Sequence, residues 1–330
     1  MKRILVFSMF IAIVILPFLE FGASDVLAVE KTAQDYFNEG TSFAQKGMLE
    51  KAEEAFESAI TLDPGFAGRA YFNLGTAYAQ GKNLQKAIHF YEKALQFNPE
   101  GIIIHMNLAN AYLSMGSLDK AVSTYNTIVE LDPKAAWPHY NLANIYLQHK
   151  MYPEAVVSFK KAISINPSKF RNVHLQLGFA YQMLNNYPDA VAEYEKALAK
   201  NPENYKAYYN MGLSYYHMKD LDKAIGAYQN AVKYSPNYAE AITNLGLAYF
   251  YKKEYVLAKN AFNKALSIKP DLGEALFGMA LVSREQEEYE TALEYTQKAM
   301  KTGKNVSQDF IKELKEKLEK KSPPTHGKGK

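Results

Sequence analysis

Apolar side chains recur along the chain at the spacing of amphipathic helices, and the predicted helices come in pairs. Residues 68–101 show the pattern most clearly, with two segments that each present one apolar face. The faces consist of Tyr71, Leu74, Gly75 and Tyr78 in the first segment and of Ala87, Tyr91 and Ala94 in the second. Pro99 ends the second segment, because proline lacks an N–H group and disfavours helical backbone in the residue before it. The pattern predicts a helical hairpin in which Gly75 and Ala87 stand at the closest approach of the helices.

The hairpin pattern recurs with a period of 34 or 35 residues. The closing position holds Pro64, Pro99, Pro133, Pro167, Pro202, Pro236 and Pro270. The position of Tyr78 is aromatic in seven successive hairpins, with Phe43, Tyr78, Tyr112, Tyr146, Tyr181, Tyr215 and Tyr249. The position of Gly75 admits only glycine or alanine: Gly40, Gly75, Ala109, Ala143, Gly178, Gly212, Gly246 and Ala280. These positions stay in phase along most of the chain, which predicts a tandem repeat array.

The array resembles the tetratricopeptide repeat family, with which it shares the period, the small-residue positions, the aromatic positions and the closing proline. The resemblance implies an all-α fold, a right-handed α-solenoid of helical hairpins that bury their cores between neighbours. Within an array spanning 29–306, units are expected at 33–66, 68–101, 102–135, 136–169, 171–204, 205–238, 239–272 and 273–306. The last unit is degenerate, since Ser283 and Thr296 replace aromatic residues.

Segments outside the repeat pattern are expected at both ends. Residues 1–28 have Lys2 and Arg3 before an apolar run and small residues at the end, which is the layout of a signal peptide; an uncleaved signal anchor is the alternative. Residues 307–321 predict an amphipathic capping helix, with a partner-binding helix as the alternative. Residues 322–330 are polar and are expected to be disordered. We expect an exported protein, periplasmic in a Gram-negative source and secreted otherwise, or membrane-anchored if the signal is retained.

Composition argues against several functions. The formal net charge is +3, from 38 basic and 35 acidic residues, which is too balanced for nucleic-acid binding or for membrane contact beyond the signal segment. The absence of cysteine excludes thiolate chemistry and cysteine zinc sites. His105, His139 and His174 recur at the position of Tyr71, but equivalent atoms of neighbouring repeats lie too far apart for one metal ion. With no catalytic motif present, we predict no enzyme activity, no cofactor and no metal.

A row of carboxamides is the distinctive feature of the first helices. The residue before Leu74 is Asn73, which points about 200° around the helix from Tyr71 and so toward the inner, concave side of the expected array. Equivalent positions hold Asn38, Asn73, Asn107, Asn141, Gln176, Asn210 and Asn244, and we call these seven the carboxamide row. A carboxamide both donates and accepts hydrogen bonds, so the row can pair with the backbone of an extended peptide. The alternative is that asparagine merely suits a polar groove. Tyr140, Tyr209 and Tyr216 are expected beside it as ligand contacts.

The carboxamide row resembles the asparagine ladder in the repeat domain of O-linked N-acetylglucosamine transferases, although the catalytic domain of those enzymes has no counterpart here. The resemblance implies peptide binding and no transferase activity. The basic clamp of co-chaperone repeat domains is absent, because the positions of Phe72 and Asn73 hold no lysine or arginine in any unit.

We therefore predict a non-enzymatic scaffold that binds an extended segment of a partner protein in its concave groove. One alternative is a self-associating structural protein. The other is an accessory subunit of an envelope or glycan-modifying enzyme complex.

Overall fold

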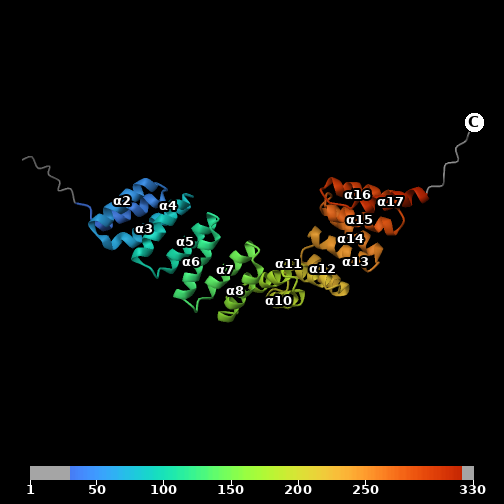
Figure 1. The fold of residues 1–330 in the computed structure, drawn as a ribbon, viewed down its shortest axis with the longest axis horizontal. Coiled ribbons are helices and arrows are strands. Elements are labelled where there is room, and N and C mark those ends of the chain that lie inside the picture. The colour runs from blue at the N-terminus through green and yellow to red at the C-terminus, as the bar shows by residue number, and fades with distance from the viewer. Residues whose placement is uncertain (1–29, 322–330) are drawn as a thin grey trace, which may run out of the picture. The chain divides into compact units, whose positions relative to one another are not determined.

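The computed structural model describes residues 30–321, so the expected signal peptide and C-terminal tail lie outside the described residues. These residues form α-helices and one short 3-10 helix, with no β-strand among them. The chain divides into two compact units, residues 1–116 and 117–330, and each is described by itself. The helices of the first unit are α1 (Ala33–Gln45), α2 (Leu49–Leu62), η1 (Pro64–Phe66), α3 (Ala67–Gln80), α4 (Leu84–Phe97) and α5 (Ile102–Ser114) (Figure 1).

The second unit continues the alternation of paired helices and ends on a single one. Its earlier helices are α6 (Leu118–Leu131), α7 (Ala136–Gln148), α8 (Tyr152–Ile165), α9 (Val173–Met183), α10 (Tyr187–Lys200) and α11 (Tyr205–His217). Its later helices are α12 (Leu221–Tyr234), α13 (Ala239–Tyr251), α14 (Tyr255–Ile268), α15 (Gly273–Glu285), α16 (Tyr289–Lys301) and α17 (Gln308–Lys321). The fold is an all-α solenoid of helical hairpins. None of the described helices is long and apolar enough to cross a bilayer.

Local backbone chemistry fixes where the helices begin and end. Most turns within hairpins contain one residue in the left-handed region, such as Lys150 with φ 60° and Lys219 with φ 63°. A left-handed residue just past a helix end reverses the chain in a few residues. The second helices end before an Asn-Pro, Asp-Pro or similar pair; Asn98, before Pro99, has φ −140°, outside the helical range.

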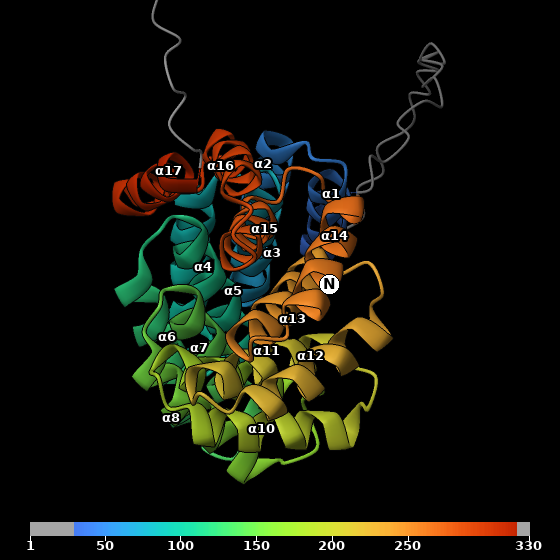
Figure 2. The same cartoon turned by 90° about the vertical axis from the view of Figure 1, so that its right-hand side faces the viewer.

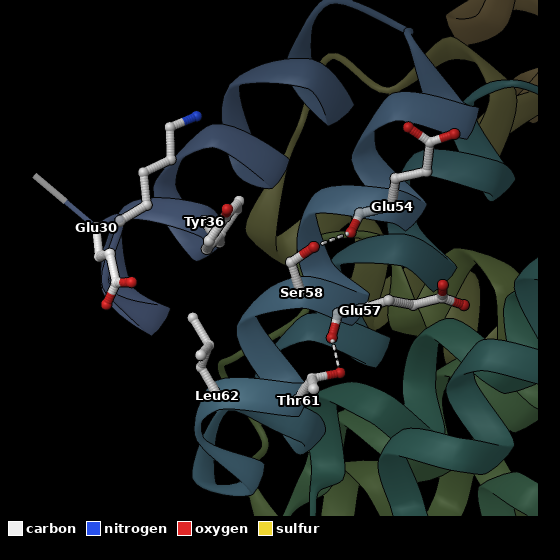
Figure 3. Close-up of a pocket in the computed structure, with 8 residues that line it drawn as sticks. Glu30, Tyr36, Glu54, Glu57, Ser58, Thr61 and Leu62 are labelled. Carbon is white, nitrogen blue, oxygen red and sulfur yellow. Dashed lines mark hydrogen bonds between the residues drawn. The ribbon is translucent and has the colours of Figure 1, made fainter. Parts of the chain in front are cut away.

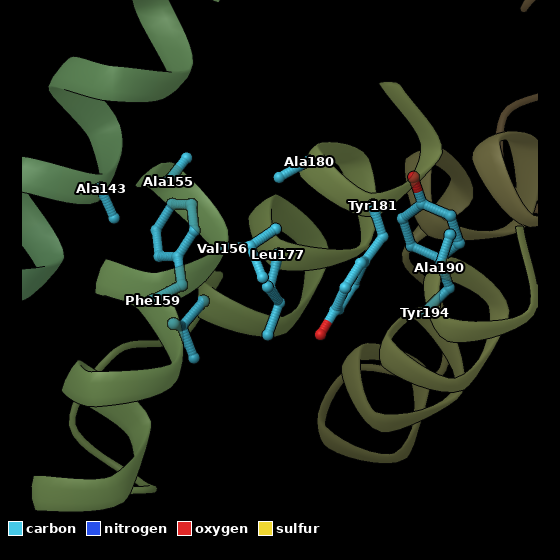
Figure 4. Close-up of a cluster of buried hydrophobic side chains, with 10 residues drawn as sticks. Ala143, Ala155, Val156, Phe159, Leu177, Ala180, Tyr181, Ala190 and Tyr194 are labelled. Carbon is cyan, nitrogen blue, oxygen red and sulfur yellow. The ribbon is translucent and has the colours of Figure 1, made fainter. Parts of the chain in front are cut away.

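Rings from the second helices form the deepest part of each hairpin core. Figure 4 shows one such cluster, in which Phe159 and Tyr194 are fully buried. These rings stand directly over the glycine positions: a Cβ atom on Gly178 would meet the Tyr194 ring at 2.7 Å. The glycine positions are therefore small because an aromatic ring of the partner helix occupies the space, and not only because two small residues face each other. Tyr146, expected in the core, is only half-buried.

Within each unit, the first helices of consecutive hairpins contact one another. For example, α1 contacts α3 and α13 contacts α15. No contact of similar extent joins the second helices of consecutive hairpins among the described residues. The first helices therefore converge and form the inner side of each run of hairpins; in Figure 2, α11 and α13 lie inside the curve that α10 and α12 bound.

The C-terminal hairpin differs from the others at its inner face. Gly278 stands where the other hairpins have an asparagine or glutamine, and a Cβ atom there would lie 2.4 Å from the ring of Phe262. The carboxamide row ends here because that ring fills the space. On the other side of the hairpin, α17 packs against α16 and buries Phe310 and Leu314 in a cluster with Ala280 and Ala292.

Candidate functional site

The seven carboxamides all lie on first helices, one each on α1, α3, α5, α7, α9, α11 and α13. The side chain of Asn38 is exposed, and the other six are half-buried. The row is thus neither sealed inside the hairpins nor scattered over the outside of the helices. Its members divide between the two units, with Asn38, Asn73 and Asn107 in the first and the remaining four in the second.

A buried tyrosine fixes the orientation of Asn210. The hydroxyl of Tyr194, on the second helix of the preceding hairpin, donates to Gln182 Oε1 at 2.7 Å. The Tyr194 hydroxyl has one proton, which this bond uses. In its second hydrogen bond, with Asn210, the hydroxyl oxygen therefore accepts from the side-chain amide group. Burial raises the pKa of Tyr194 well above its ordinary value, and the bond from Asn210 partly opposes that rise. With its amide held by Tyr194, the side-chain carbonyl oxygen of Asn210 makes no hydrogen bond within residues 30–321 and remains an acceptor.

Two further asparagines are held by tyrosines in a similar way. Tyr125, equivalent to Tyr194, is bonded by Asn141, while burial raises its pKa. The amide of Asn244 donates to the Tyr209 hydroxyl at 3.1 Å, and burial raises the pKa of Tyr209. In all three cases the tyrosine oxygen accepts from the carboxamide N–H, so the second unit presents carbonyl oxygens as acceptors from α7, α11 and α13.

Gln176 departs from this pattern because its carbonyl oxygen, and not only its amide group, is bonded by the neighbouring repeat. Its Oε1 accepts from the Tyr140 hydroxyl at 2.9 Å, and its Nε2 donates to Asn144 Oδ1. Asn144 in turn donates to the backbone oxygen of Tyr140 at 2.9 Å. Gln176 therefore joins α7 to α9, and its oxygen is already engaged.

The first unit has a shallow polar trough beside Asn73. The trough has a volume of about 150 Å³ and lies between α1 and α3. Its lining residues are Thr41, Ala44, Gln45, Asn73, Thr76, Ala77 and Gln80. Asn73 and Asn107 make no side-chain hydrogen bond within residues 30–321. Gln45 and Gln80 were not predicted as site residues, although they follow Asn38 and Asn73 by seven residues and so lie on the same helix face as these members of the row.

The three predicted aromatic contacts have different surroundings. Tyr140 is stacked on Phe170 with ring centroids 4.1 Å apart, and Tyr209 lies against Tyr238 at 4.9 Å. Both rings are therefore built into contacts between neighbouring repeats. Tyr216 lines a hollow of about 520 Å³ at the turn edge of the second unit, away from the bonded amides.

The three recurring histidines have different local surroundings. His174 is buried with its Nδ1 2.7 Å from Glu193 Oε2, and Glu193 also bonds Lys196 at 2.6 Å. His105 Nε2 lies 2.8 Å from the backbone oxygen of Pro99. Burial, together with Lys161, lowers the pKa of His139. Within residues 30–321 no group of histidine and acidic side chains is arranged to hold a metal ion.

A larger polar hollow of about 760 Å³ lies at the first hairpin, where the chain enters α1 (Figure 3). Glu54 and Glu57 line it together with Tyr36 and Leu62. The hydroxyls of Ser58 and Thr61 also line it, and each bonds a backbone oxygen of its own helix, at 2.9 and 2.8 Å. The hydroxyl protons of Ser58 and Thr61 are therefore used within the helix.

The repeated hairpins, with their first helices on the inner side, define a helical-repeat solenoid. Family models described as tetratricopeptide repeat match residues 34–66, 68–100, 136–169, 175–242 and 239–272, and one described as TPR repeat matches 109–150. The chain belongs to the tetratricopeptide repeat family. A comparison with curated protein sequences finds no match.

Solved structures with the same fold include YrrB, described as a tetratricopeptide repeat protein with an unusual peptide-binding site. It is 29% identical, with a TM-score of 0.50, over 56% of this chain and 95% of its own. The C-terminal part of a repeat protein from Cytophaga hutchinsonii is 16% identical, with a TM-score of 0.62, over 74% of this chain and 99% of its own. PilF of Pseudomonas aeruginosa is 19% identical, with a TM-score of 0.52, over 66% of this chain and 98% of its own. The repeat fold and YrrB suggest a protein-interaction scaffold.

Proposed function

We propose that this protein is an exported, non-enzymatic scaffold that holds an extended segment of a partner protein along its inner carboxamide row. The observation that carries the proposal is the fixed orientation of Asn141, Asn210 and Asn244, whose amide groups are held by tyrosines. An oriented carbonyl oxygen at the same position in three of four consecutive repeats is a preformed acceptor for the backbone N–H groups of an extended chain.

The recognised feature is then the backbone of the partner. Backbone N–H groups are present in every residue except proline, so such a row selects extended conformation more than side-chain identity. In the first unit, taken by itself, the polar trough at Asn73 offers similar chemistry, since Thr41, Gln45 and Thr76 add hydroxyl and amide groups. YrrB, which is described as having an unusual peptide-binding site, supports peptide binding as the function of this protein.

Export is the part of the proposal that rests on the sequence alone. The apolar segment before residue 29, with Lys2 and Arg3 ahead of it, has the layout of a signal peptide. Tagging the C-terminus and fractionating the source cells tests this part. An exported, processed protein is expected, and an unprocessed protein in the cytosol would contradict it.

The groove is tested with peptides selected from a random library on the purified protein. The triple variant Asn141→Ala, Asn210→Ala, Asn244→Ala should bind the selected peptides at least tenfold more weakly, because three hydrogen bonds of about 1 kcal/mol each are lost. Asn263→Ala removes an exposed asparagine of α14, on a second helix, and should leave binding unchanged. Equal binding by the triple variant, with unchanged helical circular dichroism, would refute the proposal.

A further inference from the structure

Six aromatic rings form an unbroken series at the turn edge of the second unit, and we call them the aromatic edge. They lie where α11 and α13 end and where α10 and α14 begin. Successive ring centroids are 5.0, 5.9, 5.9, 5.5 and 5.7 Å apart in the order Tyr187, His217, Tyr216, Tyr251, Phe250 and Tyr255. The series crosses three hairpins and is separate from the carboxamide row.

The aromatic edge continues into apolar side chains that face solvent. Tyr251 is 54% exposed, and Val256 and Leu257, in the first turn of α14, are 69% and 46% exposed. In the preceding hairpin the positions of these two residues hold Asp222 and Lys223. The helix therefore does not require apolar residues there, and contiguous exposed apolar surface marks interaction sites.

The centre of the aromatic edge is hollowed and bordered by hydrogen-bond donors. The hollow of about 520 Å³ is lined by Tyr216, His217, Lys219, Leu221 and Tyr251. The hydroxyl of Tyr216 bonds that of Tyr251, and burial with this neighbour raises the pKa of Tyr216. The bond uses one hydroxyl proton and leaves the other to donate outward. Within residues 30–321 the ammonium group of Lys219 makes no ion pair.

The geometry points to a binding site for a proline-rich, extended segment of a partner protein that carries a carboxylate beside its prolines. Proline presents an apolar ring and a backbone carbonyl but no N–H group, which suits apolar walls bordered by donors. Proline-rich segments dock in aromatic-lined grooves because their polyproline II conformation is already formed. The carboxylate would pair with Lys219.

Two other ligand classes fit the lining less well. A sugar brings many hydroxyl donors, but the lining of the hollow includes no carboxylate or carboxamide side chain to accept from them. An anionic membrane surface would meet acidic groups, since Lys252, next to Tyr251, is paired with Asp222 at 2.6 Å and with Glu254 at 3.2 Å.

The test measures binding of the purified full-length protein to a synthetic peptide, acetyl-Pro-Pro-Pro-Asp-Pro-Pro-amide, by calorimetry. Tyr251→Ala should weaken binding at least tenfold and Tyr251→Phe several-fold, because the first removes the ring and the second only a donor. Lys219→Ala should weaken it several-fold. Lys150→Ala is the matched control, since Lys150 has the same left-handed backbone in another turn, and it should have no effect.

A peptide with lysine in place of aspartate should bind more weakly than the aspartate peptide. The triple carboxamide variant should bind the proline peptide normally, which separates this site from the proposed groove. The proposal is overturned if the proline peptide does not bind, or if Tyr251→Ala binds it as the wild type does. It is also overturned if cellohexaose or vesicles containing phosphatidylglycerol, and not the peptide, bind in a Tyr251-dependent way.

Discussion

The buried tyrosines of the second helices have two roles at the scale of single residues. The ring of Tyr194 fills the space over Gly178, and its hydroxyl accepts from Asn210. One side chain thus joins the core of a hairpin to the inner face of the next one. The sequence predicts the ring as a core residue, but not the hydrogen bond, because that depends on how far neighbouring repeats are offset.

Replacing Tyr194 by phenylalanine separates the two roles. Tyr194→Phe keeps the ring and removes the hydroxyl, so we expect a loss of about 1 kcal/mol in the free energy of unfolding. Binding of a selected peptide should weaken several-fold, because the amide of Asn210 is then free to rotate. Tyr228→Phe is the control, since Tyr228 occupies the equivalent position and makes no side-chain hydrogen bond within residues 30–321. Urea unfolding and calorimetry measure both effects; equal behaviour of the two variants would count against the tyrosine's orienting role.

Two glycines of one hairpin test the close approach of ring and helix. A Cβ atom on Gly212 would lie 2.6 Å from the ring of Tyr228, whereas one on Gly226 would meet nothing within 4 Å. Gly212→Val should therefore cost about 1–3 kcal/mol of unfolding free energy through overpacking. Gly226→Ala should instead stabilise by about 1 kcal/mol, because alanine favours a helix interior. Urea unfolding that gives both changes the same sign would contradict this packing.

At the scale of the element, the hairpin turns contain backbone strain that the sequence pattern does not reveal. Gly47 and Gly116 fit the left-handed position, with φ 72° and 75°, but the same position in most other turns holds lysine, asparagine or glutamate. The period and the apolar faces correctly predict which segments pair. They do not show the turn conformation, because lysine is not a typical residue for it.

Replacing Lys150 by glycine should relieve this strain. A non-glycine residue in the left-handed region lowers the free energy of unfolding by about 1–2 kcal/mol. Glycine removes this strain, but it also increases the conformational entropy of the unfolded chain, which offsets part of the stabilisation. Lys150→Gly should therefore raise the free energy of unfolding by about 1 kcal/mol in urea unfolding. Lys134→Gly, in a loop between hairpins without a positive φ, should lower it by about 0.5–1 kcal/mol. A loss of stability in Lys150→Gly would contradict the expectation.

For the whole molecule, the repeat class followed from a few positions that recur in phase, and the family comparisons confirm it. The recurrence of the carboxamide row on the first helices also followed from the sequence, because it depends on one position in each helix; its ligand contacts stay a prediction. The sequence did not predict the hydrogen bonds of Gln176, since they depend on Asn144 and Tyr140 of the preceding repeat. The sequence also did not predict the stacking of Tyr140 on Phe170, a residue that is inserted between two repeats. Features set within one helix were predictable, whereas those set between repeats were not.

The central claim is that oriented carbonyl oxygens of the carboxamide row accept hydrogen bonds from a partner's backbone. The most direct measurement replaces single backbone amides of a selected peptide by esters, which removes one N–H at a time, and compares affinities by calorimetry. Esters at the positions facing Asn141, Asn210 and Asn244 should each weaken binding by about three- to tenfold, in proportion to a hydrogen bond of about 1 kcal/mol. The same esters should have no effect on binding to the alanine variants of the facing asparagines. A peptide whose affinity is unchanged by ester replacement at every position would contradict the account.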